Sequence, residues 1–358
     1  MSALLMTIRL LTLIVTVACF AAACGGDGNS ARAVRTPAPA APRDVIAFGA
    51  QDAAGQHALH VVLPDGTGLQ ELTSEVQAVS FPRWSPDGDR IAYIVAGGRG
   101  PGTKAALRVF DFDGAITTTI SEDLLASGDE APFAWSPDGT RLAFIDTVAE
   151  GTLRLYDIDS REIISGPAIR ATSVDWSAND ELAIVAQGED ESTADIYTLE
   201  PGDEQPSLRL ERDGIEGALA WSRDGETLAF WAGETNDIAQ RALFLLSNDD
   251  DPQELGPGTD PSWSKTGRLA YSAPPAPGQR GALDIYIDGV DGAEPARLSQ
   301  SITLDRWPSW SPQEDAIAYL AEADASTTFL CLIELATQDN TCLNLPGLTP
   351  SAPAWSPY

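Results

Sequence analysis

The segment Pro82-Arg-Trp-Ser-Pro-Asp-Gly-Asp-Arg-Ile-Ala-Tyr93 holds a tryptophan, a tight turn and the start of a strand. In Ser-Pro-Asp-Gly, the proline presets φ for a type I turn, the aspartate accepts backbone N–H groups and the glycine takes the left-handed position. Ile91-Ala92-Tyr93 then sets a small residue between two bulky ones, which suits a strand packed closely on one face. The segment therefore predicts two strands joined by a short turn.

Trp-Ser recurs along the whole chain at intervals of 41 to 51 residues. An aliphatic-Ala-large triplet such as Leu142-Ala143-Phe144 follows each of the first six copies. This interval is the length of a four-stranded propeller blade, roughly 40–50 residues. We expect the repeated indoles to wedge between neighbouring blades as core residues rather than to bind a ligand. They are Trp84, Trp135, Trp176, Trp221, Trp263, Trp310 and Trp355.

The two ends of the repeat complement each other. The triplet Ile46-Ala47-Phe48 has no Trp-Ser before it, and Trp355-Ser356 has no triplet after it. If the tryptophan strand is the first of its blade, the C-terminal strand completes the blade that the N-terminus begins. Such closure removes two unpaired sheet edges. The expected fold is all-β, a seven-bladed propeller over residues 44–358 closed by this pairing, with six or eight blades as the alternatives.

The motif Pro-x-Trp-Ser-Pro-Asp-Gly-x-x-Ile-Ala-Tyr resembles the WD40-like (PD40) repeats of the TolB-type β-propeller family, and the resemblance covers residues 44–358. It implies the propeller fold but little about function, because one fold hosts many functions. The family's namesake has an α/β domain ahead of six blades. We do not expect that domain here, so its binding partners are not transferred to this chain.

The first 23 residues have the features of an export signal. Arg9 precedes the apolar run Leu10–Phe20, and small residues follow at positions 21–23. A basic start, a short apolar core and a small-residue exit are typical of a secretory signal peptide. The run is shorter than the roughly 20 residues that a membrane-spanning helix needs.

Cys24 follows these small residues and precedes Gly-Gly-Asp-Gly, which resembles a bacterial lipoprotein processing site. The resemblance implies cleavage after Ala23 and a lipid on Cys24. Ala21 departs from the family, which usually has a larger aliphatic residue there; Cys19 and plain signal cleavage are the alternatives. Residues 24–43 are rich in Gly and Ser, then in Pro and Ala, and predict a flexible-to-extended tether. The expected location is extracytoplasmic, at the cell surface or in the periplasm, with the membrane contacted through this lipid.

Two cysteines remain in the mature chain, Cys331 and Cys342. Their apolar runs are separated by Thr337-Gln-Asp-Asn340, so a hairpin would place them opposite each other. An oxidising compartment permits a disulfide. The alternative is a pair of separate buried thiols.

Charge limits the partners of the chain. It holds 22 Lys and Arg against 53 Asp and Glu, a net charge of −31. Such a surface repels nucleic acid and anionic lipid, and favours cationic partners or divalent ions. Alternatively, the negative charge keeps the protein soluble and protects its sheet edges from aggregation. The oxygens of Asn248–Asp251 could bind calcium, but they lack the EF-hand pattern, so no cofactor is expected.

No catalytic or metal-binding constellation is evident. The two histidines, His57 and His60, are three residues apart, a spacing that puts them on opposite faces of a strand. The chain has no Gly-x-Ser-x-Gly elbow, phosphate-binding loop, zinc pattern or dinucleotide motif. Trp231 and Trp307 fall outside the repeat and are better candidates for ligand contact, with ordinary packing as the alternative.

Recognition is expected on the irregular loops 97–104, 233–240 and 273–280, on the face opposite the short turns. The leading hypothesis is a non-catalytic, envelope-anchored propeller that binds a protein or another extracytoplasmic ligand and is monomeric. One alternative is an extracytoplasmic metal-assisted hydrolase or lyase that acts on a polymer through channel-facing carboxylates. Another is a purely structural envelope component.

Overall fold

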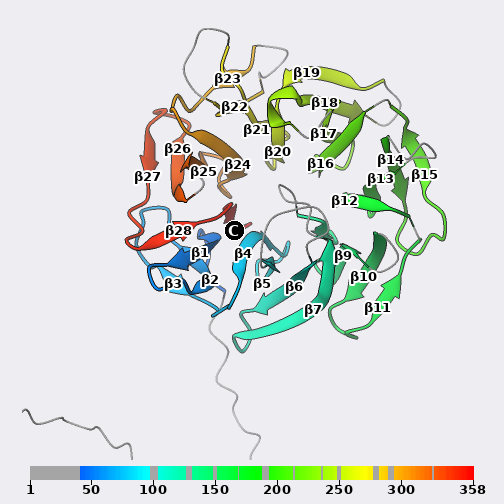
Figure 1. The fold of residues 1–358 in the computed structure, drawn as a ribbon, viewed down its shortest axis with the longest axis horizontal. Coiled ribbons are helices and arrows are strands. Elements are labelled where there is room, and N and C mark those ends of the chain that lie inside the picture. The colour runs from blue at the N-terminus through cyan, green and yellow to red at the C-terminus, as the bar shows by residue number, and fades with distance from the viewer. Residues whose placement is uncertain are drawn as a thin grey trace, which may run out of the picture. The chain divides into compact units, whose positions relative to one another are not determined.

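The computed structural model describes residues 41–358, except 97–103, 126–130, 148–150, 168, 188–192, 213, 235–236, 248–250, 277–281, 289–293 and 325. The chain divides into two units, Met1–Pro37 and Ala38–Tyr358, and every strand belongs to the second. The signal segment, Cys24 and the tether up to residue 40 lie outside the described residues. In the second unit, short sheets surround a common centre (Figure 1). The all-β fold is confirmed.

Each sheet is antiparallel, and its strands follow one another along the chain except in sheet 1, which combines strands from both chain ends. Sheet 1 comprises β28 (Leu348–Pro350), β1 (Ile46–Asp52), β2 (His57–Val62) and β3 (Gln70–Glu71), with β29 (Ala354–Trp355) also paired to β1. Sheet 2 comprises β4 (Ala78–Trp84), β5 (Arg90–Ala96), β6 (Lys104–Asp111) and β7 (Ile116–Leu125). Sheet 3 comprises β8 (Phe133–Trp135), β9 (Arg141–Asp146), β10 (Thr152–Asp157) and β11 (Ile163–Ser165). Sheets 2 and 3 are joined into eight strands by one residue pair between β7 and β9.

The other four sheets have four strands each. Sheet 4 comprises β12 (Ala171–Trp176), β13 (Leu182–Gln187), β14 (Ala194–Leu199) and β15 (Ser207–Leu210). Sheet 5 comprises β16 (Ile215–Trp221), β17 (Thr227–Gly233), β18 (Ala242–Ser247) and β19 (Gln253–Pro257), with a short 3-10 helix at Ile238–Gln240. Sheet 6 comprises β20 (Thr259–Trp263), β21 (Leu269–Ala273), β22 (Asp284–Ile287) and β23 (Ala296–Arg297). Sheet 7 comprises β24 (Leu304–Trp310), β25 (Ala316–Asp324), β26 (Thr327–Glu334) and β27 (Asn340–Cys342).

The strand that ends on a repeat tryptophan is the inner strand of its sheet. Figure 1 places β4, β12, β16, β20 and β24 toward the centre and β7, β11, β15 and β19 at the periphery. The core lies between neighbouring sheets: Phe133 and Trp135 of sheet 3, for example, pack with Ile94 and Leu107 of sheet 2. The described residues contain no helix that is long and apolar enough to cross a membrane.

The chain ends meet in sheet 1. Ile46 pairs with Trp355, and Ser356 N–H donates to the Val45 carbonyl over 2.9 Å. A Cβ on Gly49 would lie 2.0 Å from the Val79 carbonyl oxygen of sheet 2, so this close approach requires glycine. The C-terminal strand therefore occupies the inner position of the sheet that the N-terminus begins.

The indole N–H groups link successive inner strands. Four of the seven bond to the carbonyl of the residue just before the preceding repeat tryptophan, as in Trp135 Nε1 to Arg83 O over 3.0 Å. The same bond joins Trp263 to Ala220 and Trp310 to Ser262. It also crosses the chain ends, from Trp84 Nε1 to Ala354 O over 3.0 Å. The remaining copies are Trp176 and Trp355, which donate to Asp180 and Asp44, and Trp221, whose Nε1 has no partner among the described residues.

The serine of Trp-Ser connects the turn to the next strand. Ser136 is fully buried; its hydroxyl donates to Asp138 Oδ1 over 2.6 Å and accepts Arg141 N–H over 2.9 Å. Where the turn glycine is replaced, Asp180 and Glu314 still adopt positive φ, 63° and 59°. Glu314 accepts two hydrogen bonds from Thr266 of the neighbouring turn. The repeat is thus conserved in geometry even where its residues change.

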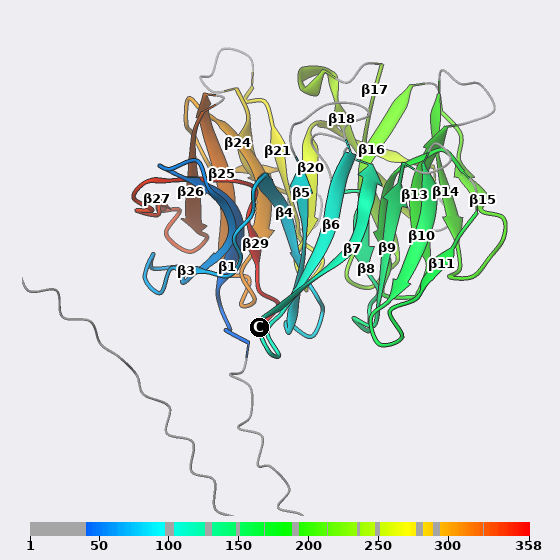
Figure 2. The same ribbon diagram turned by 60° about the horizontal axis from the view of Figure 1, so that its bottom comes forward.

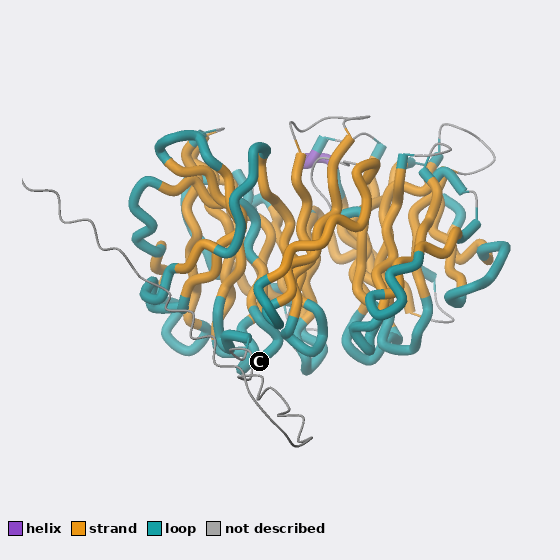
Figure 3. Tube along the Cα trace, turned by 90° about the horizontal axis from the view of Figure 1, so that it is seen from below, coloured by secondary structure: helices purple, strands orange, loops and turns teal. Residues whose placement is uncertain are grey.

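Cys331 and Cys342 are paired opposite each other on β26 and β27 and form a disulfide. The bond fixes the outermost strand of sheet 7 just before the chain crosses to β28. The turns after each Trp-Ser lie along one edge of the ring, here called the turn face, where the C-terminus also lies (Figures 2 and 3). The opposite edge is called the loop face.

Replacing Trp135 by Phe should remove the bond to Arg83 O and leave that carbonyl unpaired, whereas Trp221→Phe removes no such bond. Both tryptophans are 8% exposed, so the loss of packing is matched. We expect Trp135→Phe to lower the free energy of unfolding by about 1 kcal/mol more than Trp221→Phe, measured by urea denaturation. Equal losses would contradict a stabilising role for the indole bond.

Candidate ligand-binding site

The inner strands enclose an axial cavity of about 310 Å³. Its wall comes from the residues one, two and three positions before the repeat tryptophan in five copies. The copy ending at Trp176 contributes Ser173 and Asp175, and the copy ending at Trp135 contributes Ala131. The volume lies at the lower end of the range for small-molecule sites, roughly 300–1,000 Å³. The cavity is therefore built from the part of the repeat whose residue types vary most.

Four of these wall residues have a left-handed backbone. The residue three positions before the tryptophan has φ of 48° at Phe81 and Ala218, and 54° at Asp260 and Trp307. The pairing register of each strand shifts at this point, as in a β-bulge. Bulges re-aim side chains, and bulky residues rarely adopt positive φ. Such conformations cluster at binding sites, which makes this ring of bulges a candidate site.

Two aromatic rings meet in the wall. Phe81 of β4 and Trp307 of β24 lie edge to face, with ring centroids 5.7 Å apart. Trp307, which the sequence singled out for falling outside the repeat, thus lies at the cavity. Trp231, singled out for the same reason, is 3% exposed on β17 beneath the guanidinium of Arg241 and does not line the cavity.

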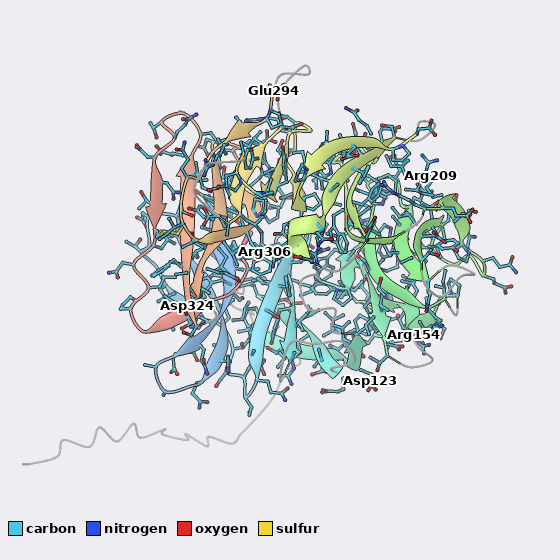
Figure 4. All side chains as sticks on the ribbon, turned by 45° about the horizontal axis from the view of Figure 1, so that its top comes forward. Asp123, Arg154, Arg209, Glu294, Arg306 and Asp324 are labelled. Atoms are coloured by element: carbon cyan, nitrogen blue, oxygen red, sulfur yellow. A yellow bond between two sulfur atoms is a disulfide. The ribbon has the colours of Figure 1, made fainter. Side chains whose placement is uncertain are left out.

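One charged pair in the wall is closed to solvent. Arg306 donates from Nε and Nη2 to the two carboxylate oxygens of Asp260, each over 2.9 Å, and both side chains are buried. The Arg306 guanidinium also stacks on Trp307, 4.1 Å from the ring centroid. Figure 4 shows Arg306 near the centre of the ring, whereas Arg154 and Arg209 lie toward its periphery. The pair orients the Trp307 ring.

A second charged pair is open to the cavity. Arg83 Nη1 lies 3.6 Å from Asp175 Oδ1, and the side chains are 37% and 18% exposed. Asp175 Oδ2 accepts Trp221 N–H over 2.8 Å, and Arg83 Nη1 donates to Phe133 O over 3.0 Å. Burial raises the pKa of Asp175, and the charge of Arg83 and the Trp221 N–H oppose this rise. This looser pair is the polar feature that a ligand could engage.

The histidines are not brought together as a metal site. His60 is 5% exposed, stacks on Phe48 at 5.4 Å and has its pKa lowered by burial. His57 lines a second hollow of about 760 Å³ with Glu322 and the exposed Val76. The ranges that the structure describes contain no group of three or more His, Cys, Asp or Glu side chains able to hold a metal ion.

The predicted recognition loops lie partly outside the described residues, at 97–103, 235–236 and 277–280. The calcium hypothesis at residues 248–251 falls there as well, except for Asp251. Sequence reasoning missed Phe81, Arg83, Asp175 and Asp260 as site residues. The available signal was their position: each lies one or three residues before Trp-Ser, where residue type changes from copy to copy.

No protein-family model matches the chain, and no curated protein matches it. Among solved structures, TolB from Acinetobacter baumannii matches with a TM-score of 0.58 and 15% identity, over 88% of this chain and 68% of that one. A prolyl endopeptidase matches with a TM-score of 0.58 and 12% identity, over 87% of this chain and 49% of that one. An oligogalacturonate lyase in complex with manganese matches with a TM-score of 0.57 and 12% identity, over 77% of this chain and 82% of that one.

At these identities the likeness shows the fold alone. The chain spans about half the length of the endopeptidase and about two thirds of TolB. The resemblance of the repeats to the TolB-type propeller is confirmed at the level of the fold. The matches include both TolB and enzymes, so function has to be argued from the cavity.

Because burial raises the pKa of Asp175 in the folded protein, its ionisation as the pH rises through that pKa lowers the free energy of unfolding. Asparagine does not ionise. Relative to the parent, Asp175→Asn should therefore gain stability between about pH 4 and pH 7, measured by urea denaturation across that range.

Asp138→Asn is the matched control, because the Ser136 hydroxyl holds the pKa of Asp138 below its usual value. That variant should lose stability relative to the parent as the pH rises from about 2 to about 5, because the parent gains stability between the lowered folded pKa of Asp138 and its unfolded pKa near 4. The same direction of change in both variants would refute the assignment for Asp175.

Proposed function

We propose that this chain is a non-catalytic binding propeller of the cell envelope, exported by residues 1–23 and anchored by a lipid on Cys24. Its ligand occupies the axial cavity. The observation that carries the proposal is the composition of the wall: the repeating residues hold the ring, while rings and charges that do not repeat face the cavity. Binding and catalytic residues tend to lie on irregular segments held by a rigid scaffold.

Enzyme action through channel carboxylates is the second candidate, and the fold match to an oligogalacturonate lyase in complex with manganese favours considering it. The two carboxylates in the cavity wall argue for binding instead. Asp260 receives two hydrogen bonds from Arg306, and Asp175 faces Arg83 and accepts Trp221 N–H. Among the described residues that line the cavity, these two are the only acidic ones.

The place where the chain enters the ring suggests how the anchored protein is oriented relative to the membrane. Asp44 N–H donates to the Tyr358 carbonyl over 2.6 Å, and Tyr358 lies beside Gly88 in the turn after Trp84. The chain thus enters the ring from the turn face. The anchored propeller would turn this face toward the membrane and the loop face away from it.

Ligand-observed NMR with a library of ring-bearing fragments tests the site. Trp307→Ala should weaken binding of the cavity-directed fragments about ten-fold, the effect of losing one stacking partner and its buried area. Phe329→Ala is the matched control, because Phe329 is 44% exposed and does not line the cavity. An unchanged set of fragments on Trp307→Ala, or no fragment binding to the parent, would overturn the proposed site.

Metabolic labelling of cells with a lipid probe tests the anchor. The parent and Cys19→Ala should incorporate the label, and Cys24→Ala should not, because only Cys24 follows the small residues of the processing site. Label retained by Cys24→Ala would place the lipid elsewhere.

A further inference from the structure

In four of the seven copies, the residue just before the repeat tryptophan serves the ring through its backbone carbonyl. The carbonyls of Arg83, Ala220, Ser262 and Ala354 accept the indole N–H of the next copy. The side chain at this position is therefore free to vary without loss of that bond. Five of the seven copies carry a small neutral residue there, and only two carry a charge, Arg83 and Asp175.

These two charged residues come from sheets 2 and 4 and meet across the inner strand of sheet 3, to which Arg83 also donates through Phe133 O. Asp175 also serves the scaffold, because its Oδ2 accepts the Trp221 N–H of the next inner strand, as the Ser309 hydroxyl accepts the Trp355 N–H. The charge of Arg83 is not needed for the indole bond, which uses the Arg83 carbonyl. Arg83 thus places a positive charge in the cavity wall at a position where every other copy of the repeat has Ala, Ser or Asp, and this points to recognition.

The Arg83 guanidinium has N–H donors that can bind a ligand. A guanidinium carries five N–H groups, and the hydrogen bond to Phe133 O is the one that Arg83 makes within the described chain. The 3.6 Å separation from Asp175 is an ion pair rather than a hydrogen bond. The Arg83 side chain is 37% exposed and lines the cavity.

The acceptors of the cavity are engaged more fully than its donors. Both oxygens of Asp260 receive hydrogen bonds from the buried Arg306, and Asp175 Oδ2 receives the Trp221 N–H. The cavity therefore presents donors to a ligand, although the chain as a whole has a net charge of −31.

The apolar part of the wall suits a flat ring. Phe81 and Trp307 provide two aromatic surfaces, and Pro82 and Pro308 follow them in the lining. A cavity of about 310 Å³ holds one small ring-bearing molecule rather than a folded segment of another protein.

Resting on the proposed function, we infer that the axial cavity binds an organic carboxylate that carries a ring. The carboxylate accepts hydrogen bonds from Arg83, and the ring packs on Phe81 and Trp307. The planar guanidinium matches a carboxylate in a bidentate geometry. Asp175 competes with the ligand for Arg83, so the two residues act on affinity in opposite directions.

Isothermal titration calorimetry with 3-phenylpropionate, and with 3-phenylpropanamide as the neutral probe of the same shape, tests this inference. The carboxylate should bind the parent at least ten-fold more tightly than the amide. Arg83→Gln should remove this preference, since a charge-assisted hydrogen bond is worth about one to two decades of affinity. Asp175→Asn should tighten carboxylate binding several-fold, because the competing anion is gone.

Arg154→Gln is the control, since Arg154 is paired with Asp146 and does not line the cavity. Arg83→Lys, which keeps the charge but not the planar fork, should retain part of the preference, and guards against misfolding of the glutamine variant. Equal binding of acid and amide, both weakened by Trp307→Ala, would overturn the carboxylate inference while sustaining the proposed site. Binding of neither probe to the parent, or binding insensitive to Trp307→Ala, would count against the cavity site itself.

Discussion

The ring is held by a recurring hydrogen bond, which four of the seven repeat tryptophans make, from an indole N–H to the backbone carbonyl of the residue before the preceding repeat tryptophan. It sets the spacing between neighbouring inner strands because a buried indole donor must find an acceptor at a fixed distance from its ring. The bond from Trp84 to Ala354 has the same form as the one from Trp135 to Arg83. The C-terminal strand therefore stands in the same relation to sheet 2 as the inner strand of sheet 2 does to sheet 3, although the chain ends lie between them.

Because this bond uses a carbonyl, it leaves the side chain of the accepting residue unconstrained. Arg83 illustrates the consequence, since its carbonyl holds Trp135 while its guanidinium lines the cavity. The same residue can therefore serve the scaffold through its backbone and the site through its side chain. The bulges at Phe81 and Trp307 extend this separation, because they leave the strand ladder and turn their residues toward the axis.

The repeat allowed the scaffold to be predicted in some detail. The interval between Trp-Ser copies indicated four-stranded units, and the complementary ends at Ile46 and Trp355 indicated where the chain ends would meet, as their pairing shows. The site was harder to predict. Arg83 and Asp175 are far apart in sequence, and only the ring brings them within 3.6 Å. The positive φ of Phe81 is contrary to the preference of a bulky residue and so has no local signal. Trp307 was identifiable because it breaks the repeat, whereas Trp231 breaks it equally and is packed in the core.

In this protein a repeating scaffold surrounds a non-repeating axial site, and a crystal structure tests this division directly. A crystal structure of the mature protein purified from its own cells should show electron density for a co-purified small molecule in the axial cavity, in contact with Arg83 and Trp307. Density for a bound molecule confined to the periphery of the sheets or to the turn face, with the axial cavity filled only by water, would contradict the account.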